Sequence, residues 1–269
     1  MTNQLKYKTI VGIFLAFLLL PLIVIVIWSF TNQWPWPQLI PTSFGLRGWE
    51  YFFSETSKSI YTLIFSVGLS AVVTLLTIII TIPASKALAL YNFKGKKFFD
   101  ILIFLPIIVP MVAVAMGIHI QFIRWGLANT VLGVIIIHII PCIPYAVRIL
   151  KSVYELVGEQ MELQARNLGA TKWQTFVYVS LPMILPGIVS AGSLVFIVSF
   201  SQYFLTFLIG GGQVTTFTMI MFPFIQSGDR MLGSVYSVVF VITTLICLLI
   251  VEKLTNKFYK SKVKGYQYV

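Results

Sequence analysis

Residues 154–187 read YELVGEQMELQARNLGATKWQTFVYVSLPMILPG and form a polar stretch between two long apolar parts of the chain. The stretch holds three of the eight acidic residues of the protein, namely Glu155, Glu159 and Glu162. Its pattern predicts two short helices with a sharp corner between them. A connection between apolar segments does not need this much structure. The pattern therefore indicates either a well-folded interfacial loop or a docking element for a soluble partner.

The two predicted helices have recognisable ends. The first covers residues 157–168, where one apolar stripe recurs at helical spacing and consists of Val157, Met161, Ala165 and Leu168. Gly169 follows where a left-handed residue commonly ends a helix, a conformation that costs glycine least. Thr171 and Gln174 form a capping-box pattern for the second helix. Pro182 and Pro186 predict the point at which the chain leaves that helix for the next apolar segment.

Composition points to a membrane protein. Of the 269 residues, 58% are hydrophobic and only 10% are charged, whereas soluble domains carry about 25% charged residues. Six apolar segments are long enough to cross a bilayer, at 10–30, 60–84, 99–119, 130–147, 183–209 and 232–251. The first has no small-residue cleavage site after it, so we expect a retained span and not a cleaved signal peptide.

The basic residues predict orientation. Fifteen of the nineteen lysines and arginines fall on the side that carries both termini and the polar stretch; the other four are Arg47, Lys58, Arg124 and Arg230. The positive-inside rule therefore places both termini in the cytoplasm. The net charge of +11 is then explained without nucleic acid. On the outer side, Trp28, Trp34, Trp36 and Trp49 are typical of an aromatic belt at the membrane surface.

Several kinds of chemistry are missing from the sequence. No glycine-rich loop ends in Gly-Lys-Ser or Gly-Lys-Thr, so we expect no nucleotide site in this chain. His119 and His138 have no ligands at metal-binding spacing around them, and such histidines are more often hydrogen-bonded structural residues. No carboxylate occupies the centre of a predicted span, which weakens the case for a proton- or sodium-coupled carrier. We therefore expect a membrane protein that is not an enzyme and holds no cofactor or metal.

One polar stripe lies inside the fifth predicted span. Ser199, Gln202, Tyr203 and Thr206 stand at i, i+3, i+4 and i+7, which places all four on one face of a continuous helix. In hydrocarbon such a face should turn toward protein or water. It could line the route of a hydrophilic solute, or it could only form hydrogen bonds to neighbouring helices.

The polar stretch resembles the cytoplasmic EAA loop of permease subunits of binding-protein-dependent ABC importers. That motif has a glutamate, two alanines, three residues, a glycine, nine residues, and then isoleucine, any residue, leucine and proline. Aligning the glycine with Gly169 places the motif on Leu163, Gln164, Ala165, Gly169, Val179, Leu181 and Pro182. The motif's glutamate is thus replaced by Leu163, and Glu162 stands one residue earlier. The resemblance implies that these residues, with Glu162 and Ala170, contact an ATPase.

The resemblance also implies an architecture and partners. It implies an all-α membrane protein with six transmembrane helices, the type I importer permease fold, and both termini in the cytoplasm. The whole chain, 1–269, would be one permease domain with an N-terminal helix at 10–30, a five-helix core at 60–251 and a coupling loop at 154–182. Its partners would be two ATPase subunits that bind ATP and magnesium, a second homologous permease subunit and an extracytoplasmic solute-binding protein, all at the bacterial inner membrane.

The solute is predicted by resemblance alone. Residues 199–230 resemble the subgroup that serves polyamines, opine-like compounds, phosphonates, thiamine and ferric iron. The layout is most similar to spermidine and putrescine permeases, so a polyamine is the first expectation and a phosphonate, thiamine, ferric iron or another small solute is the alternative. The alternative of a different class is a stand-alone secondary carrier or channel.

Overall fold

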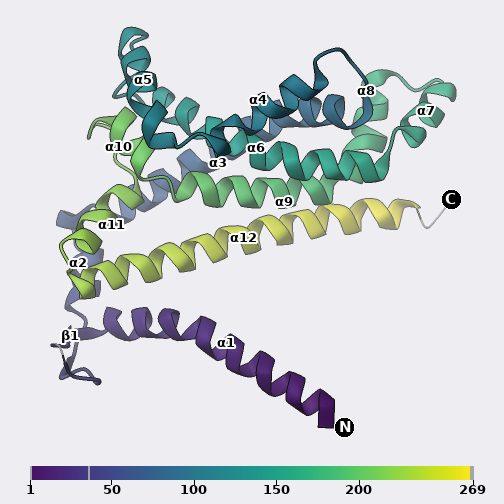
Figure 1. Cartoon of the computed structure of the whole chain (residues 1–269). Coiled ribbons are helices and arrows are strands. Elements are labelled where there is room, and N and C mark those ends of the chain that lie inside the picture. Colours follow the sequence, from purple (N-terminus) through teal and green to yellow (C-terminus); the bar gives the residue numbers. More distant parts are fainter. Residues whose placement is uncertain (1, 36, 267–269) are drawn as a thin grey trace. The chain divides into compact units, whose positions relative to one another are not determined.

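The computed structural model describes residues 2–35 and 37–266 (Figure 1). The described chain divides into two compact units, one made of Met1–Leu63 with Met219–Leu245 and the other of Ile64–Thr218 with Ile246–Val269.

Helices dominate both units. The helices are α1 (Thr2–Ser29), α2 (Arg47–Phe53), α3 (Ser59–Leu90), α4 (Lys96–Ile108), α5 (Met111–Arg124), α6 (Val131–Val157), α7 (Gln160–Asn167), α8 (Lys172–Thr175), α9 (Leu181–Phe200), α10 (Phe204–Gly210), α11 (Phe217–Gln226) and α12 (Arg230–Tyr266). A 3₁₀ turn, η1 (Glu55–Ser57), precedes α3, and a π-helix, η2 (Phe176–Ser180), joins α8 to α9.

Among the described residues, five helical stretches are long and apolar enough to cross a membrane, and a sixth span results if α4 and α5 count as one bent span. The span predicted at 99–119 is bent, because α4 and α5 meet at an angle of 102°. Pro110 explains the bend: it lacks an N–H donor and disfavours helical backbone at the residue before it. Val109 accordingly has extended backbone, with φ −83° and ψ 127°.

The first unit contains a small β-hairpin, which the expectation of an all-α chain did not include. Strand β1 (Thr31–Gln33) pairs antiparallel with β2 (Ser43–Phe44). Gly45 follows β2, and the Asn32 side chain lies so close to it that a β-carbon would come within 2.2 Å of the Asn32 amide nitrogen. Of the predicted aromatic belt, Trp28, Trp34 and Trp49 are described, and Trp36 lies outside the described residues.

The second unit is built on α6 and α9, which run side by side (Figure 1). Their buried contact includes Val134, Ile137 and Leu150 from α6 with Ala191 and Val195 from α9. Small residues let membrane helices approach closely. At Gly187 of α9 a β-carbon would lie 2.7 Å from a methyl group of Val153. This close pair positions the segments at its ends: α7 and α8 at one end, α10 and α5 at the other (Figure 1).

The predicted orientation can be tested by labelling. Lys97→Cys, in the first turn of α4, should resist an impermeant thiol reagent in intact cells, and Arg47→Cys should react, because the positive-inside rule places them on opposite sides. Both variants should react after the membrane is permeabilised, which serves as the control. Reaction of Lys97→Cys in intact cells would contradict the predicted orientation.

Candidate functional site

The corner of the polar stretch is a Schellman motif, as the position of the glycine predicted. Gly169 has a left-handed backbone with φ +92°. Its N–H donates to the carbonyl of Arg166 at 2.9 Å, and the N–H of Ala170 donates to the carbonyl of Ala165 at 3.0 Å. These two bonds satisfy the last carbonyls of α7 and turn the chain sharply. The glycine of the motif thus suits the shape of the corner, to which Ala165 and Ala170 contribute backbone groups.

The predicted capping box is also confirmed. The Gln174 N–H donates to Thr171 Oγ1 at 3.3 Å, and the Thr171 N–H donates to Gln174 Oε1 at 2.8 Å. The prediction that the chain leaves this helix at Pro182 is wrong, however. Helical backbone continues from Lys172 to Phe200, and the π-helix η2 lies just before Pro182, where the Leu181 N–H donates to the carbonyl of Phe176.

The apolar stripe predicted for the first helix is not its buried face. Met161 is 50% exposed and Leu168 is 89% exposed, whereas Glu162 is only 7% exposed. The helix is also shorter than predicted, because α6 runs on to Val157 and Gly158 separates it from α7. The most polar residue of α7 therefore faces the rest of the unit, and its apolar residues face outward.

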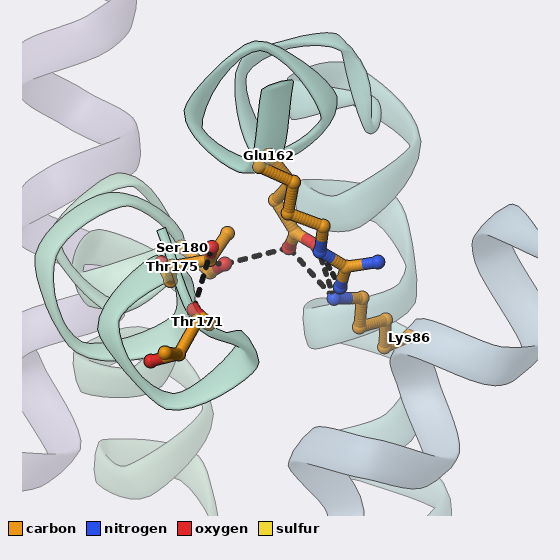
Figure 2. A network of polar contacts seen from close by, with 6 residues as sticks. Lys86, Glu162, Thr171, Thr175 and Ser180 are labelled. Atoms are coloured by element: carbon orange, nitrogen blue, oxygen red, sulfur yellow. Dashed lines mark hydrogen bonds and ion pairs between the residues drawn. The ribbon is translucent and has the colours of Figure 1, made fainter. Parts of the chain in front are cut away.

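Glu162 lies at the centre of a polar network that joins three segments (Figure 2). Lys86, near the end of α3, donates to both carboxylate oxygens, at 2.7 and 2.5 Å. The Ser180 hydroxyl of η2 donates to Oε1 at 2.6 Å. Arg166, one turn further along α7, has its guanidinium 3.7 Å from Oε2. We call these four residues, Lys86, Glu162, Arg166 and Ser180, the glutamate clasp.

The clasp keeps the carboxylate ionised. Burial raises the pKa of Glu162, but hydrogen bonds from Lys86 and Ser180 and the charges of Lys86 and Arg166 outweigh burial, so the pKa is lower than usual. Hydrogen bonds to a charged partner are worth about 1.5–3 kcal/mol each. A buried carboxylate with two such donors is therefore a strong local tie between α7, α3 and η2.

The corner also carries an open groove of about 460 Å³. The motif residues Ala165, Gly169, Ala170 and Val179 line it, together with Leu168. Large side chains of the stretch stand exposed: Tyr178 in the groove lining, and Leu163, at 47%, and Trp173 elsewhere. Of the other motif residues, Gln164 is exposed and Leu181 and Pro182 are half-buried in the first turn of α9.

The polar stripe of the fifth span is not a continuous helical face. Helix α9 ends at Phe200 and α10 begins at Phe204, so residues 201–203 break the span. Ser199 and Thr206 are buried and both reach His138 of α6, at 3.1 Å to Nδ1 and 2.8 Å to Nε2. His138 is a hydrogen-bonded residue, as expected of such histidines. Its link to the stripe was not predicted, because 61 residues separate it from Ser199.

The other two stripe residues lie apart from His138. Gln202 lines a cavity of about 400 Å³ next to the bend between α4 and α5, with Pro110, Pro141 and Tyr145 among the other lining residues. Tyr203 stacks on Phe207, with ring centroids 5.8 Å apart. Gln202 thus lines a cavity, whereas Ser199 and Thr206 belong to the hydrogen-bond network around His138.

Comparison with known proteins decides the family. Residues 78–261, more than half of the chain, match the family described as binding-protein-dependent transport system inner membrane component. The chain belongs to this family. It is therefore an inner-membrane permease component of an ABC importer, with several membrane-spanning helices.

Individual relatives have different solutes in their names. The chain is 25% identical over 248 residues to PhnV of Salmonella paratyphi A, named for 2-aminoethylphosphonate transport, with 91% of this chain and 92% of the relative covered. It is 25% identical over 225 residues to the putrescine transport system permease protein PotI of Escherichia coli K12, with 79% and 77% covered. A crystal structure of a bacterial ABC transporter for alginate import has the same fold, with a TM-score of 0.67, 17% identity and 96% of each chain covered.

The clasp predicts a local loss of stability when its carboxylate is neutralised. Glu162→Gln should destabilise α7 by about 2 kcal/mol, because the Lys86 ammonium loses its charged partner. Hydrogen exchange of residues 160–167 should then be roughly thirtyfold faster, since 1.4 kcal/mol is a factor of ten. Glu159→Gln, a neutralised exposed acid beside α7, is the control. Unchanged exchange in Glu162→Gln would show that the clasp does not hold α7.

The same tie should depend on pH in a definite direction. Because the pKa of Glu162 is lowered in the folded loop, its contribution is present above the usual glutamate pKa of about 4.3. This contribution to stability is lost as the pH falls through the lowered pKa of Glu162. Lower protection of residues 160–167 in acid, after correction for the slower intrinsic exchange at low pH, is the expected result, and Glu162→Gln should not show this loss.

Proposed function

We propose that this permease subunit works with two ATPase subunits that hydrolyse ATP, and that residues 154–182 receive their movement. The observation that carries the proposal is that this loop has both an exposed groove and a buried carboxylate that ties it to other segments. Its motif residues Ala165, Gly169, Ala170 and Val179 line an exposed groove, while Glu162, three residues before Ala165 on α7, ties this helix to α3 and η2. A partner seated in the groove would thus push on a segment that is tied to two long helices.

The covalent and hydrogen-bonded connections of α7 determine which long helices its movement would reach. The π-helix η2 continues directly into α9, and Lys86 belongs to the last turns of α3. A displacement of α7 therefore reaches α9 through Ser180 and α3 through Lys86. We assign Glu162 a positioning role, because its carboxylate faces inward, and we assign the partner contact to exposed residues such as Leu163 and Leu168. ATP and magnesium would be held by the ATPase subunits.

The remaining partners are inferred from the chain's surface and from its relatives. The apolar side chains of α1 between Ile10 and Leu20 are exposed, which supports contact with lipid or with a second permease subunit. A solved alginate transporter carries a periplasmic protein bound to its substrate. We propose that this chain, too, receives its solute from an extracytoplasmic binding protein and forms half of the translocation pathway.

For the solute we propose a small aliphatic amine. Putrescine and 2-aminoethylphosphonate, the solutes in the names of two relatives, share a protonated primary amine. The cavity beside Gln202 is lined mainly by apolar residues, with the uncharged polar side chains of Gln202 and Tyr145 and no carboxylate among its lining residues. A polyamine carries two or more positive charges into this neutral lining, and an aminoalkylphosphonate balances its amine with an anion. The layout of residues 199–230 favours the polyamine, and the cavity favours the aminoalkylphosphonate.

Gly169 provides the test of coupling. Gly169→Val should uncouple ATP hydrolysis from transport, or reduce the amount of ATPase that co-purifies, because valine is strained at φ +92° by roughly 1 kcal/mol or more. There is open space around the residue, so the effect should come from the shape of the corner. Gly95→Val places the same strain, at φ +88°, in another loop on the predicted cytoplasmic side and is the control.

Two results would contradict this assignment. Normal transport and normal solute-stimulated ATPase activity of Gly169→Val in reconstituted complexes would remove the coupling role. A parent chain that transports solute without any co-purifying ATPase would instead indicate a carrier or channel.

Gln202 provides the test of the pathway and the solute. Gln202→Leu should reduce uptake about tenfold while the assembled complex remains intact, because a buried polar contact to the solute is lost. Ser201→Ala, beside it on the exposed side of the break, should transport normally. Competition of uptake by putrescine or by 2-aminoethylphosphonate distinguishes the two solutes. Unchanged uptake and selectivity in Gln202→Leu would exclude Gln202 from the pathway.

A further inference from the structure

A hollow in the first unit belongs to neither site above. It has a volume of about 810 Å³ and is lined by Trp28 at the end of α1, Arg47 at the start of α2, and Asp229 and Arg230 at the start of α12, among others. Two of the four basic residues on the predicted outer side thus meet in one hollow. On that side the protein otherwise carries little positive charge.

The arginines are available to a ligand. Among the described residues neither Arg47 nor Arg230 has a carboxylate within ion-pair distance. The Asp229 carboxylate instead accepts the Leu232 N–H at 3.0 Å and caps α12. The Arg230 guanidinium lies 4.8 Å from the centre of the Trp28 ring. A guanidinium that stacks on an aromatic ring keeps its N–H groups free at the edge, where they can bind an anion.

A third donor lacks an acceptor. The Trp28 indole Nε1 is buried and has no hydrogen-bond partner in the structure, although buried indole N–H groups usually have one. Arg47, Arg230 and Trp28 come from three different elements, α2, α12 and α1. Donors from three elements that line one hollow suit an anion with several oxygens pointing in different directions. A tetrahedral oxyanion has this shape, and a flat carboxylate has only two oxygens in one plane.

We propose that this hollow binds a phosphate- or phosphonate-type oxyanion. Arg47 and Arg230 supply charge and paired N–H donors, and the Trp28 indole supplies a third donor. The group has two possible sources. One is the head group of an anionic phospholipid, because tryptophan and arginine are common at the membrane surface. The other is a small phosphate or phosphonate compound outside the cell. The proposal depends on neither solute considered above.

Tryptophan fluorescence can test the proposal, because Trp28 is part of the hollow. The full chain is placed in nanodiscs of phosphatidylcholine and titrated with inorganic phosphate or methylphosphonate, or placed in nanodiscs that contain phosphatidylglycerol. We expect a saturable change in emission that Trp28→Phe abolishes. The double variant Arg47→Gln, Arg230→Gln should bind at least tenfold more weakly, because it loses charge-assisted hydrogen bonds. The matched control is Lys58→Gln, Arg124→Gln, which removes the other two basic residues of the predicted outer side.

The outcomes separate the two sources. A response to phosphate or methylphosphonate in phosphatidylcholine indicates a small compound, and a response to phosphatidylglycerol alone indicates a lipid head group; both uphold the site. Equal responses in the double variant and the control, or no response to any probe, would overturn it. If the double variant loses helical circular dichroism, Arg230→Lys replaces it: lysine keeps the charge but loses the paired donors, and binding should still weaken severalfold.

Discussion

The buried carboxylate of Glu162 is the interaction on which the loop end of the second unit depends. Helix α7 has only eight residues, and helices this short are not stable alone in water. Lys86 and Ser180 hold it in place through one side chain. Since α7 turns its most polar residue inward, its apolar residues remain outside, next to the groove at Gly169. The tie that anchors the helix therefore also creates the exposed apolar surface that we propose as the contact for an ATPase.

A second group of polar contacts holds an irregular segment, the break between α9 and α10, inside the second unit. The break between α9 and α10 frees backbone carbonyls, and in a membrane such groups need partners from the protein. The carbonyl of Gln202 accepts hydroxyls from Thr206 at 3.0 Å and Thr218 at 2.9 Å. His138 joins Ser199 before the break to Thr206 after it. The irregular backbone is thus held by side chains, and the Gln202 side chain stays beside the cavity. A rigid break next to a cavity is a suitable place for selecting a solute.

Features set by neighbouring residues could be predicted from the sequence. The apolar spans, the left-handed Gly169 and the capping box of Thr171 and Gln174 depend on local composition or on backbone geometry within a few residues. Features that depend on residues far apart in the sequence could not be predicted in this way. Glu162 faces inward because Lys86, 76 residues earlier in the chain, reaches it, so helical periodicity alone assigned the wrong face. The break at 201–203 escaped prediction because the apolar pattern continues across it, and the partner role of His138 escaped because its contacts come from two other helices.

The glutamate clasp also allows the proposed transmission of movement from the ATPase subunits to be measured. In complexes reconstituted with the ATPase subunits, the number of solute molecules transported per ATP should be compared for Lys86→Met, Glu162→Gln and the variant that carries both. If the pair transmits movement as a unit, each single substitution lowers this ratio and the double variant is no worse than the more affected single one, because residues that act together are not additive. A ratio that stays at the parent value in both single variants, or that falls by the product of two independent effects in the double variant, would contradict the account.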